Sequence, residues 1–243
     1  MSNVSFEAPR GMRDFYPEDM AWRNRVFDAW RAAAERFGFQ PYDACVVESL
    51  ALLQRKSGEE VSEQIYAFQD KSGRALALRP EMTPTLARMV AARQSRLHFP
   101  IKWGAIAQCF RYERMTRGRK REHYQLNLDI VGTESVLAEA ELLGAAVQAV
   151  RLMGLPDDAW RIHVSSRALL GELLAKAGIP AAQHPPVFMA LDKRGKIPDE
   201  EIAALLAQAG LPQDAIDAAF RLLAVDSLEA AAALAGEDSP AIA

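Results

Sequence analysis

Side chains that could bind an anion or an ammonium group gather in residues 110–132, FRYERMTRGRKREHYQLNLDIVG. Residues 109–113 predict a short strand in which Arg111 and Glu113 share a face, because side chains in a strand repeat every two residues. A second strand follows, with an apolar face of Tyr124, Leu126, Leu128 and Ile130 and a polar face of Gln125, Asn127 and Asp129. The two strands predict a hairpin with one apolar and one polar face.

The polar face of this hairpin has two interpretations. It could be a solvent-exposed surface, which is the usual fate of polar residues that alternate along an antiparallel sheet. It could also be the floor of a ligand site, in which a guanidinium group binds phosphate and the acids and amides bind an ammonium group. The pattern alone leaves both open.

The turn between the two strands is strongly basic, with Arg114, Arg117, Arg119, Lys120 and Arg121 around Gly118. Five cations within eight residues repel one another unless an anion compensates them. This spacing indicates a phosphate-binding hairpin, and a solvated loop is the alternative.

The elements that must position this hairpin form a mixed α+β unit. Helical spacing predicts a helix over residues 18–37, with Gly38 as its C-cap, and another over 134–153. Thr83 and Pro84 predict the N-cap and first position of a helix that runs to about Arg93. Strands are expected at residues 42–50, 65–68, 74–78, 101–107 and 160–165. Residues 70–73, DKSG, predict a glycine-containing hairpin turn between the second and third of these strands.

The remainder of the sequence indicates helices only, at residues 166–177, 199–208, 213–223 and 227–234. The composition therefore predicts two parts, residues 1–167 and residues 168–243.

Composition narrows the class of protein. The chain has 243 residues, of which half are hydrophobic, and a formal net charge of -3, which argues against a general polyanion binder. Cys45 and Cys109 lie in apolar segments and are interpreted as buried thiols of a reducing compartment. The four histidines show no metal-ligand spacing, so no metal site is expected. Because the sequence has no signal peptide and no apolar run of membrane-spanning length, we expect a cytoplasmic protein without a membrane partner.

Three segments together resemble the histidyl-tRNA synthetase family of class II aminoacyl-tRNA synthetases. Residues 9–17, PRGMRDFYP, are similar to the N-terminal signature of that family, and residues 78–83, LRPEMT, to its amino-acid-binding turn. The hairpin resembles class II motif 2, opened by Arg111-x-Glu113 and closed by Gln125-x-x-x-Asp129. The resemblance implies a class II synthetase-like antiparallel sheet flanked by helices, which is followed by a helical insertion.

The sequence also departs from the family pattern. Residues 44–48, ACVVE, stand where motif 1 usually has an early proline, and this bears on the dimer contact that motif 1 provides. Motif 3, the histidine-specific loop and the anticodon-binding domain are absent. Residues 1–167 are therefore expected to be the first part of a catalytic core and residues 168–243 its helical insertion, so that the chain is a fragment with weak or no activity by itself.

The family implies that L-histidine is activated with ATP and Mg²⁺ and is then transferred to tRNA(His) by a homodimer. Arg111 matches the catalytic residue that contacts the α-phosphate and the substrate carboxylate. The amino-acid-binding residues implied are Glu81, Met82, Thr83, Arg111, Gln125 and Asp129, and the ATP-binding residues are Arg111, Glu113, Arg119 and Arg121.

Each of these roles has a structural alternative. Thr83 could be a helix cap, Glu81 a surface acid and Glu113 an ion-pair partner of Arg111, while Arg119 and Arg121 could belong to a solvated loop.

Two other functions compete with the ligase. One is the synthetase-like regulatory subunit of ATP phosphoribosyltransferase, a relative that tends to lose the charges of motif 2. This chain keeps Arg111, Glu113, Gln125 and Asp129, which favours the ligase. The other is a free-standing RNA-binding module, against which the acidic balance and the lack of aromatic residues interleaved with basic ones argue.

Overall fold

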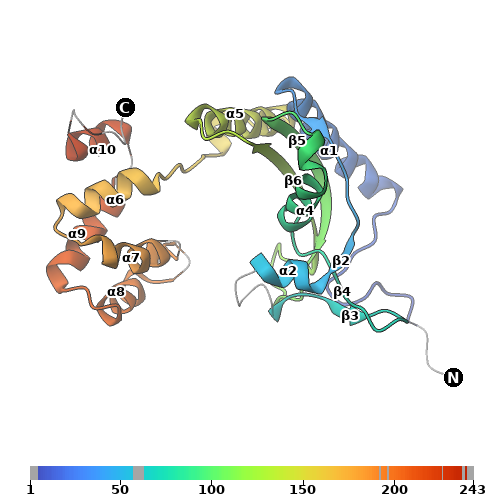
Figure 1. The fold of residues 1–243 in the computed structure, drawn as a ribbon, viewed down its shortest axis with the longest axis horizontal. Coiled ribbons are helices and arrows are strands. Elements are labelled where there is room, and N and C mark those ends of the chain that lie inside the picture. Colours follow the sequence, from blue (N-terminus) through green and yellow to red (C-terminus); the bar gives the residue numbers. More distant parts are fainter. Residues whose placement is uncertain are drawn as a thin grey trace. The chain divides into compact units, whose positions relative to one another are not determined.

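The computed structural model describes residues 5–56, 63–191, 193–195, 197–225, 227–236 and 239. It divides into two compact units, Met1–Trp160 and Arg161–Ala243 (Figure 1). The first unit contains two small sheets flanked by helices, which confirms the predicted α+β class. In the described part of the chain, no helix is both long and apolar enough to cross a membrane.

The larger sheet carries the predicted hairpin. Strands β5 (Ile101–Phe110) and β6 (Glu122–Val131) pair antiparallel along their whole length. The short strand β1 (Gln40–Pro41) pairs with β5 in parallel, so the strand order is β1-β5-β6.

The two faces of this hairpin differ as the alternation predicts. Helices α1 (Pro17–Arg36) and α5 (Val136–Leu152) pack on one face, where the Tyr124 ring meets the Phe27 ring at 5.1 Å. On the same face Gly104 of β5 lies so close to Leu128 that an added Cβ would be 3.0 Å from the Leu128 side chain. The opposite face carries Gln125, Asn127 and Asp129, which are half-buried.

The smaller sheet has the order β2-β4-β3, with β2 (Val47–Ser49), β4 (Ala75–Leu78) and β3 (Ala67–Gln69) all antiparallel. The predicted hairpin turn joins β3 to β4, and the amide of Gly73 donates to the carbonyl oxygen of Asp70 at 2.9 Å. Helices α2 (Leu50–Lys56) and α4 (Thr83–Arg93) contact each other beside this sheet.

One predicted strand is shorter than expected, and another is absent from the described residues. Residues 42–50 form only β2 before helix α2 begins at Leu50, because Leu53 occupies a fully buried position that a helix from Leu50 reaches. Residues 160–165 alternate in polarity but contain no strand, since no neighbouring strand pairs with them. They connect the two compact units.

The prediction of two buried cysteines is half correct. Cys109 is fully buried in β5, whereas Cys45 is exposed. Apolar neighbours suggested a strand interior for Cys45, but Val46 and Val47 beside it are themselves exposed.

The described part of the second unit consists of helices and turns. The four predicted helices are present, and a fifth, α7, was missed because two prolines follow its first residue. Its helices are α6 (Arg167–Lys176), α7 (His184–Leu191), α8 (Asp199–Gln208), α9 (Gln213–Leu223) and α10 (Leu228–Ala235). The 3-10 turn η3 (Ala181–Gln183) also lies in this unit, whereas η1 (Gln94–Arg96) and η2 (Asp157–Ala159) lie in the first unit. The buried core of the second unit includes Leu174, Ile179, Val187, Ile202, Leu206 and Leu211.

Candidate functional site

The first strand of the hairpin ends at Phe110, one residue before Arg111, the first predicted site residue of the hairpin. Strand β5 ends at Phe110, so the expectation that Arg111 and Glu113 lie on a common strand face is wrong. The amide of Phe110 donates to the carbonyl oxygen of Arg79 at 2.9 Å, and the amide of Arg111 donates to that of Arg121 at 2.9 Å. The first bond joins the end of β5 to the residue that follows β4, and the second continues the pairing of the hairpin by one residue.

Arg79 anchors the predicted amino-acid-binding turn, residues 78–83. Its side chain is only 3% exposed, and it donates to the carbonyl oxygens of Gln108 at 2.9 Å and Ala44 at 3.0 Å. Arg111 is tied to the same turn, because its Nε–H donates to the carbonyl oxygen of Pro80 at 3.0 Å. These bonds place this turn beside Arg111. The sequence placed Arg79 within the predicted turn but assigned it no role of its own.

A basic cavity of about 310 Å³ lies at this end of the hairpin, lined by Arg111, Glu113, Gly118, Arg119, Lys120 and His123. Glu113 forms an ion pair with Arg119, with 3.2 Å between Oε2 and Nη1, and is not an ion-pair partner of Arg111. Three cationic side chains and one carboxylate therefore face the space, and this balance suits an anionic ligand.

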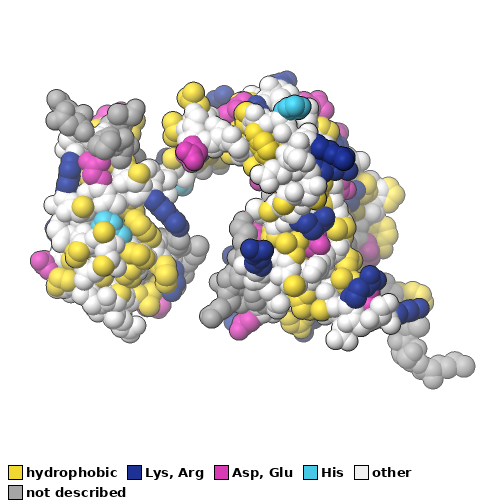
Figure 2. Space-filling model, viewed as in Figure 1, with side chains coloured by type: hydrophobic (Ala, Val, Ile, Leu, Met, Phe, Trp, Pro, Cys, Tyr) yellow, Lys and Arg dark blue, Asp and Glu magenta, His cyan; other side chains and the backbone are white. Residues whose placement is uncertain are grey.

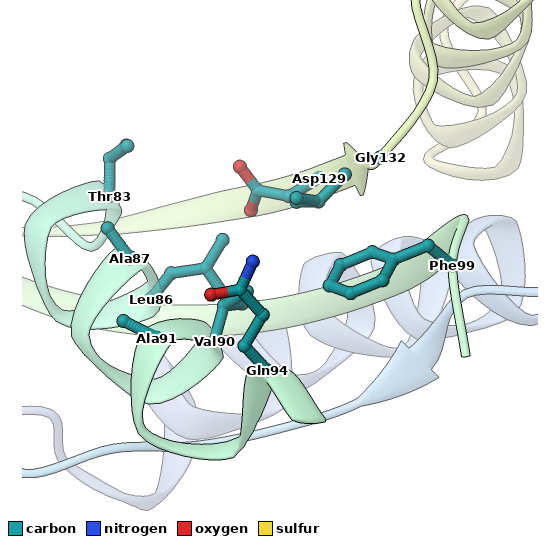
Figure 3. A pocket seen from close by; sticks show the side chains of 10 residues that line it. Thr83, Leu86, Ala87, Val90, Ala91, Gln94, Phe99, Asp129 and Gly132 are labelled. Atoms are coloured by element: carbon teal, nitrogen blue, oxygen red, sulfur yellow. The ribbon is translucent and has the colours of Figure 1, made fainter. Parts of the chain in front are cut away.

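A second cavity, of about 690 Å³, lies between helix α4 and the end of β6. Its walls are largely apolar and consist of Thr83, Leu86, Ala87, Val90, Ala91, Gln94, Phe99, Asp129, Val131 and Gly132. The Asp129 carboxylate and the Gln94 amide point into it from opposite walls (Figure 3).

Thr83 lines this second cavity but does not cap the helix as predicted. Helix α4 begins at Thr83 itself, and Met82 occupies the N-cap position without a side-chain cap bond. The helix therefore does not use the Thr83 hydroxyl as a cap, and Thr83 lies at the edge of the cavity (Figure 3).

A polar row on β6 connects the two cavities. His123 Nε2 lies 3.2 Å from Gln125 Oε1, and Gln125 Nε2 donates to Asn127 Oδ1 at 2.6 Å. With Asp129, these residues follow one face at two-residue spacing and span about 20 Å. Burial lowers the pKa of His123, and the nearby Arg111 charge adds to this effect, while the Gln125 hydrogen bond and Glu113 oppose it.

His123 and Gln94 were missed from the sequence. The alternation that identified Gln125 and Asp129 extends back by two residues to His123. Gln94 follows Thr83 at spacings that lie on one helical face, through Ala87 and Ala91.

The pKa shifts of Cys109 and Tyr42 indicate which charged side chains lie near these two groups. Burial raises the pKa of Cys109 to about 11, Arg79 and Arg111 oppose this shift, and Glu81 adds to it. Burial and the Asp129 carboxylate also raise the pKa of Tyr42. Glu81 and Arg111 therefore lie near Cys109 at one end of the hairpin, and Tyr42 lies near Asp129 at the other.

Met82 and Arg121 lie outside both cavity linings. The Met82 side chain is fully buried with Ala105, Ala107 and Cys109, and its sulfur accepts from Arg79 Nη1 at 3.4 Å. The Arg121 guanidinium carbon lies 3.7 Å from the centre of the Tyr112 ring.

The predicted site residues thus separate into groups. Arg111, Glu113 and Arg119 line the basic cavity, Thr83 and Asp129 line the apolar one, Gln125 lies between them on β6, and Glu81 lies beside Arg111 on the anchored turn. Among the described residues no group of three or more His, Cys, Asp or Glu side chains could hold a metal ion.

Basic side chains do not form one continuous field on the face of the first unit that Figure 2 shows. On the face shown in Figure 2, they stand singly or in small groups among apolar and acidic side chains. This distribution does not favour a general nucleic-acid-binding surface.

Comparisons with known proteins agree with the site. A family model described as histidyl-tRNA synthetase matches residues 11–242. Histidine–tRNA ligase, chloroplastic/mitochondrial, of Arabidopsis thaliana is 43% identical over 240 residues, which cover 99% of this chain and 49% of the relative. Histidine–tRNA ligase of Natronomonas pharaonis is 42% identical over 233 residues, which cover 96% of this chain and 54% of that relative. The chain spans about half the length of these curated relatives.

Solved structures show the same fold. Histidyl-tRNA synthetase from Nostoc sp. PCC 7120 matches with a TM-score of 0.78 at 21% identity, covering 99% of this chain and 55% of that one. An ATP phosphoribosyltransferase regulatory subunit/histidyl-tRNA synthetase from Bacillus halodurans matches with a TM-score of 0.78 at 20% identity, covering 98% and 62%. The class II synthetase-like fold expected from the sequence is thereby confirmed.

The family model spans nearly the whole chain, and relatives of 42–43% identity cover almost all of it. The chain therefore belongs to the histidyl-tRNA synthetase family.

Proposed function

We propose that this chain is the first half of a histidine–tRNA ligase, which activates L-histidine with ATP to histidyl-adenylate and transfers the histidyl group to tRNA(His). The observation that carries the proposal is the bond between Arg111 Nε and the Pro80 carbonyl oxygen. It joins the guanidinium group of the basic cavity to the turn that carries Glu81.

In the activation step, a carboxylate oxygen of histidine attacks the α-phosphorus of ATP and pyrophosphate leaves. Arg111 binds the α-phosphate and the attacking carboxylate, and compensates the negative charge that grows at phosphorus. Its Nε–H is held by Pro80, so the terminal nitrogens remain available to two oxygens. Positioning and charge compensation supply most of the catalysis in such phosphoryl chemistry.

The histidine substrate is assigned to the polar face between the two cavities, with Glu81 and Gln125 toward its α-ammonium group and with Asp129 and Thr83 toward the apolar cavity. Ammonium prefers carboxylate and amide oxygens. Because Gln125 Nε2 already donates to Asn127, the Gln125 carbonyl oxygen faces away from Asn127 and toward the Arg111 end of the row. The buried Met82 supports this turn from beneath.

ATP is assigned to the basic cavity, with Arg119 at its phosphates and Glu113 near the adenine amino group. Glu113 is the one carboxylate of this lining. Mg²⁺ usually keeps several waters and binds through one or two carboxylates and the substrate phosphates. Because Glu113 pairs with Arg119 and is assigned to the adenine, we propose that the ion enters with the phosphates of the Mg·ATP substrate and takes no carboxylate of this lining.

The remaining assignments follow from the family. We assign residues 1–167 to the first part of the class II core and residues 168–243 to its insertion. We also propose a homodimer that acts in the cytoplasm. The exposed apolar side chains of Val46, Val47 and Phe68, around strands β2 and β3, support a protein contact there.

The regulatory subunit of ATP phosphoribosyltransferase remains the second candidate, because one similar structure bears both names. That similarity is at 20% identity and concerns the fold. The relatives at 42–43% identity are histidine–tRNA ligases, which favours the ligase.

Pyrophosphate exchange with L-histidine and Mg·ATP distinguishes the two functions. A form extended to the length of the relatives should show histidine-dependent exchange that Arg111→Ala abolishes, and the 243-residue chain alone should show little or none. Histidine binding without exchange, together with stimulation of a phosphoribosyltransferase, would identify the regulatory subunit. Rapid exchange by the 243-residue chain would show that the specificity elements are misplaced.

A further inference from the structure

Both backbone polar groups of Arg121, the amide and the carbonyl, form hydrogen bonds. Its amide donates to the carbonyl oxygen of Gly11 at 2.9 Å, and its carbonyl oxygen accepts from the amide of Arg111 at 2.9 Å. The N-terminal segment, the start of β6 and the end of β5 are therefore joined at a single residue. Arg121 fixes the main chain of Arg111, while Pro80 fixes the Arg111 side chain.

The side chain of Arg121 lies on an aromatic ring that is itself held in place. Its guanidinium carbon is 3.7 Å from the Tyr112 ring centre, a distance at which a cation and the face of a ring attract. The Tyr112 ring meets the Tyr66 ring edge-on at 5.4 Å, and the Tyr112 amide donates to the carbonyl oxygen of Gln64 at 2.7 Å. The Arg121 charge is thus directed at a ring outside the lining of the basic cavity.

Gly11 lets the N-terminal segment approach this arginine. Its φ is +91°, and an added Cβ would lie 2.7 Å from Cδ and 2.8 Å from Cγ of Arg121. Any other residue would therefore be strained in its backbone and would also displace the Arg121 side chain from Tyr112.

We propose that Gly11, Tyr112 and Arg121 form a clasp that positions Arg111, and that Arg121 affects nucleotide binding through this clasp without contacting the nucleotide. Tyr112 follows Arg111 in the chain, and Arg121 pairs with Arg111 across the hairpin. The clasp holds Tyr112 against Arg121 and so fixes Arg111 between them. Arg121 and Tyr112 are then positioning residues. The inference rests on the proposed role of Arg111 at ATP.

The first test is calorimetric titration of the chain with Mg·ATP at several salt concentrations. Tyr112→Ala and Arg121→Met should each weaken binding by about tenfold, and the double variant should be no weaker than either single variant. Tyr112→Phe keeps the ring face and should bind as the unaltered chain does. The dependence on salt should be unchanged in Arg121→Met, because no phosphate contact is lost.

A direct phosphate contact by Arg121 gives the opposite pattern. Tyr112→Ala would then leave Mg·ATP affinity intact, while Arg121→Met would weaken it and flatten its salt dependence. That pattern would overturn the clasp.

The second test does not need ATP to bind. The Arg111 Nε–H, bonded to Pro80, should exchange slowly with water in NMR spectra of the unliganded chain. Exchange should accelerate in Tyr112→Ala, Arg121→Met and Gly11→Ala.

Gly73→Ala is the matched control for Gly11→Ala. Gly73 has φ +77° and nothing within 4 Å of an added Cβ, so it has the backbone strain without the collision. An exchange rate at Arg111 Nε that is the same in all four variants refutes the inference. Failure of the unaltered chain to bind Mg·ATP, with slow exchange that only the three clasp variants accelerate, would instead refute the proposed ATP site and leave the clasp supported.

Discussion

Arg111 donates from Nε to the carbonyl oxygen of Pro80 at 3.0 Å, so the proposed catalytic side chain is held by the turn that carries Glu81 and Thr83. A guanidinium group can make this bond and still present two terminal nitrogens to a ligand. A lysine ammonium group cannot, because its three donors share one nitrogen. Charge alone is therefore not what Arg111 provides.

Arg111→Lys should lower kcat/KM for histidine-dependent pyrophosphate exchange about 100-fold in a form of relatives' length, equivalent to about 3 kcal/mol of transition-state stabilisation. The reason is the loss of the fixed fork, since the charge is retained. Arg119→Lys is the comparison, because the Arg119 side chain is 68% exposed and its fork is less constrained. Equal activities of the Arg111→Lys variant and the unaltered enzyme would contradict the proposed role.

Arg79→Met should destabilise the first unit by about 3 kcal/mol in guanidinium chloride unfolding followed by tryptophan fluorescence. The buried carbonyl oxygens of Gln108 and Ala44 would lose their donors. Arg74→Met removes an arginine whose side chain is 74% exposed and should change the unfolding midpoint little. Similar effects of the two substitutions would show that the Arg79 hydrogen bonds do not stabilise the fold.

The His123 imidazole should make the first unit less stable in mild acid. Its pKa is lowered in the folded state by burial and by Arg111, so below the ordinary value of 6.5 the unfolded chain binds the proton more readily. The free energy of unfolding should therefore fall as the pH decreases from 7 to 5, and His123→Gln should reduce this slope. Urea unfolding at each pH measures it, and an unchanged slope in His123→Gln would contradict the shift.

Ile202→Ala should destabilise the helical unit by about 3 kcal/mol, because Ile202 is fully buried in its core. Hydrogen exchange measured by mass spectrometry should accelerate in α6, α8 and α9 and stay unchanged in β5 and β6. Ile202→Val, which removes one methyl group, should have about a third of the effect. Equal acceleration in both units would show that they unfold together.

Local patterns were sufficient to predict the hairpin. The alternation from Tyr124 to Ile130 specifies a strand with two unlike faces, and the positive φ of Gly73 is one that its turn predicts. Both features depend only on residues that are neighbours in the sequence, so they can be predicted without knowledge of the three-dimensional structure. The site residues themselves came from the resemblance to a family, since polar alternation alone left an exposed sheet as an equal alternative.

Contacts between distant segments could not be predicted in this way. The Phe110 amide donates to the Arg79 carbonyl oxygen, and Arg111 lies 31 positions after its partner Pro80. The separation of the site into two cavities depends on the position of α4 beside β6. The spacing of residues along the sequence does not predict that position. Arg121 was assigned to ATP for its charge, and its position over Tyr112 became visible only in three dimensions.

The unequal environments of the two thiols provide a reporter that needs no engineered label. Cys45 lies at the surface and Cys109 lies beneath Arg111 and Glu81, where its pKa is about 11. An alkylating reagent at neutral pH therefore modifies Cys45 first and reaches Cys109 only when β5 separates from the turn above it. The rate at which a second alkyl group appears then measures how often the floor of the site opens.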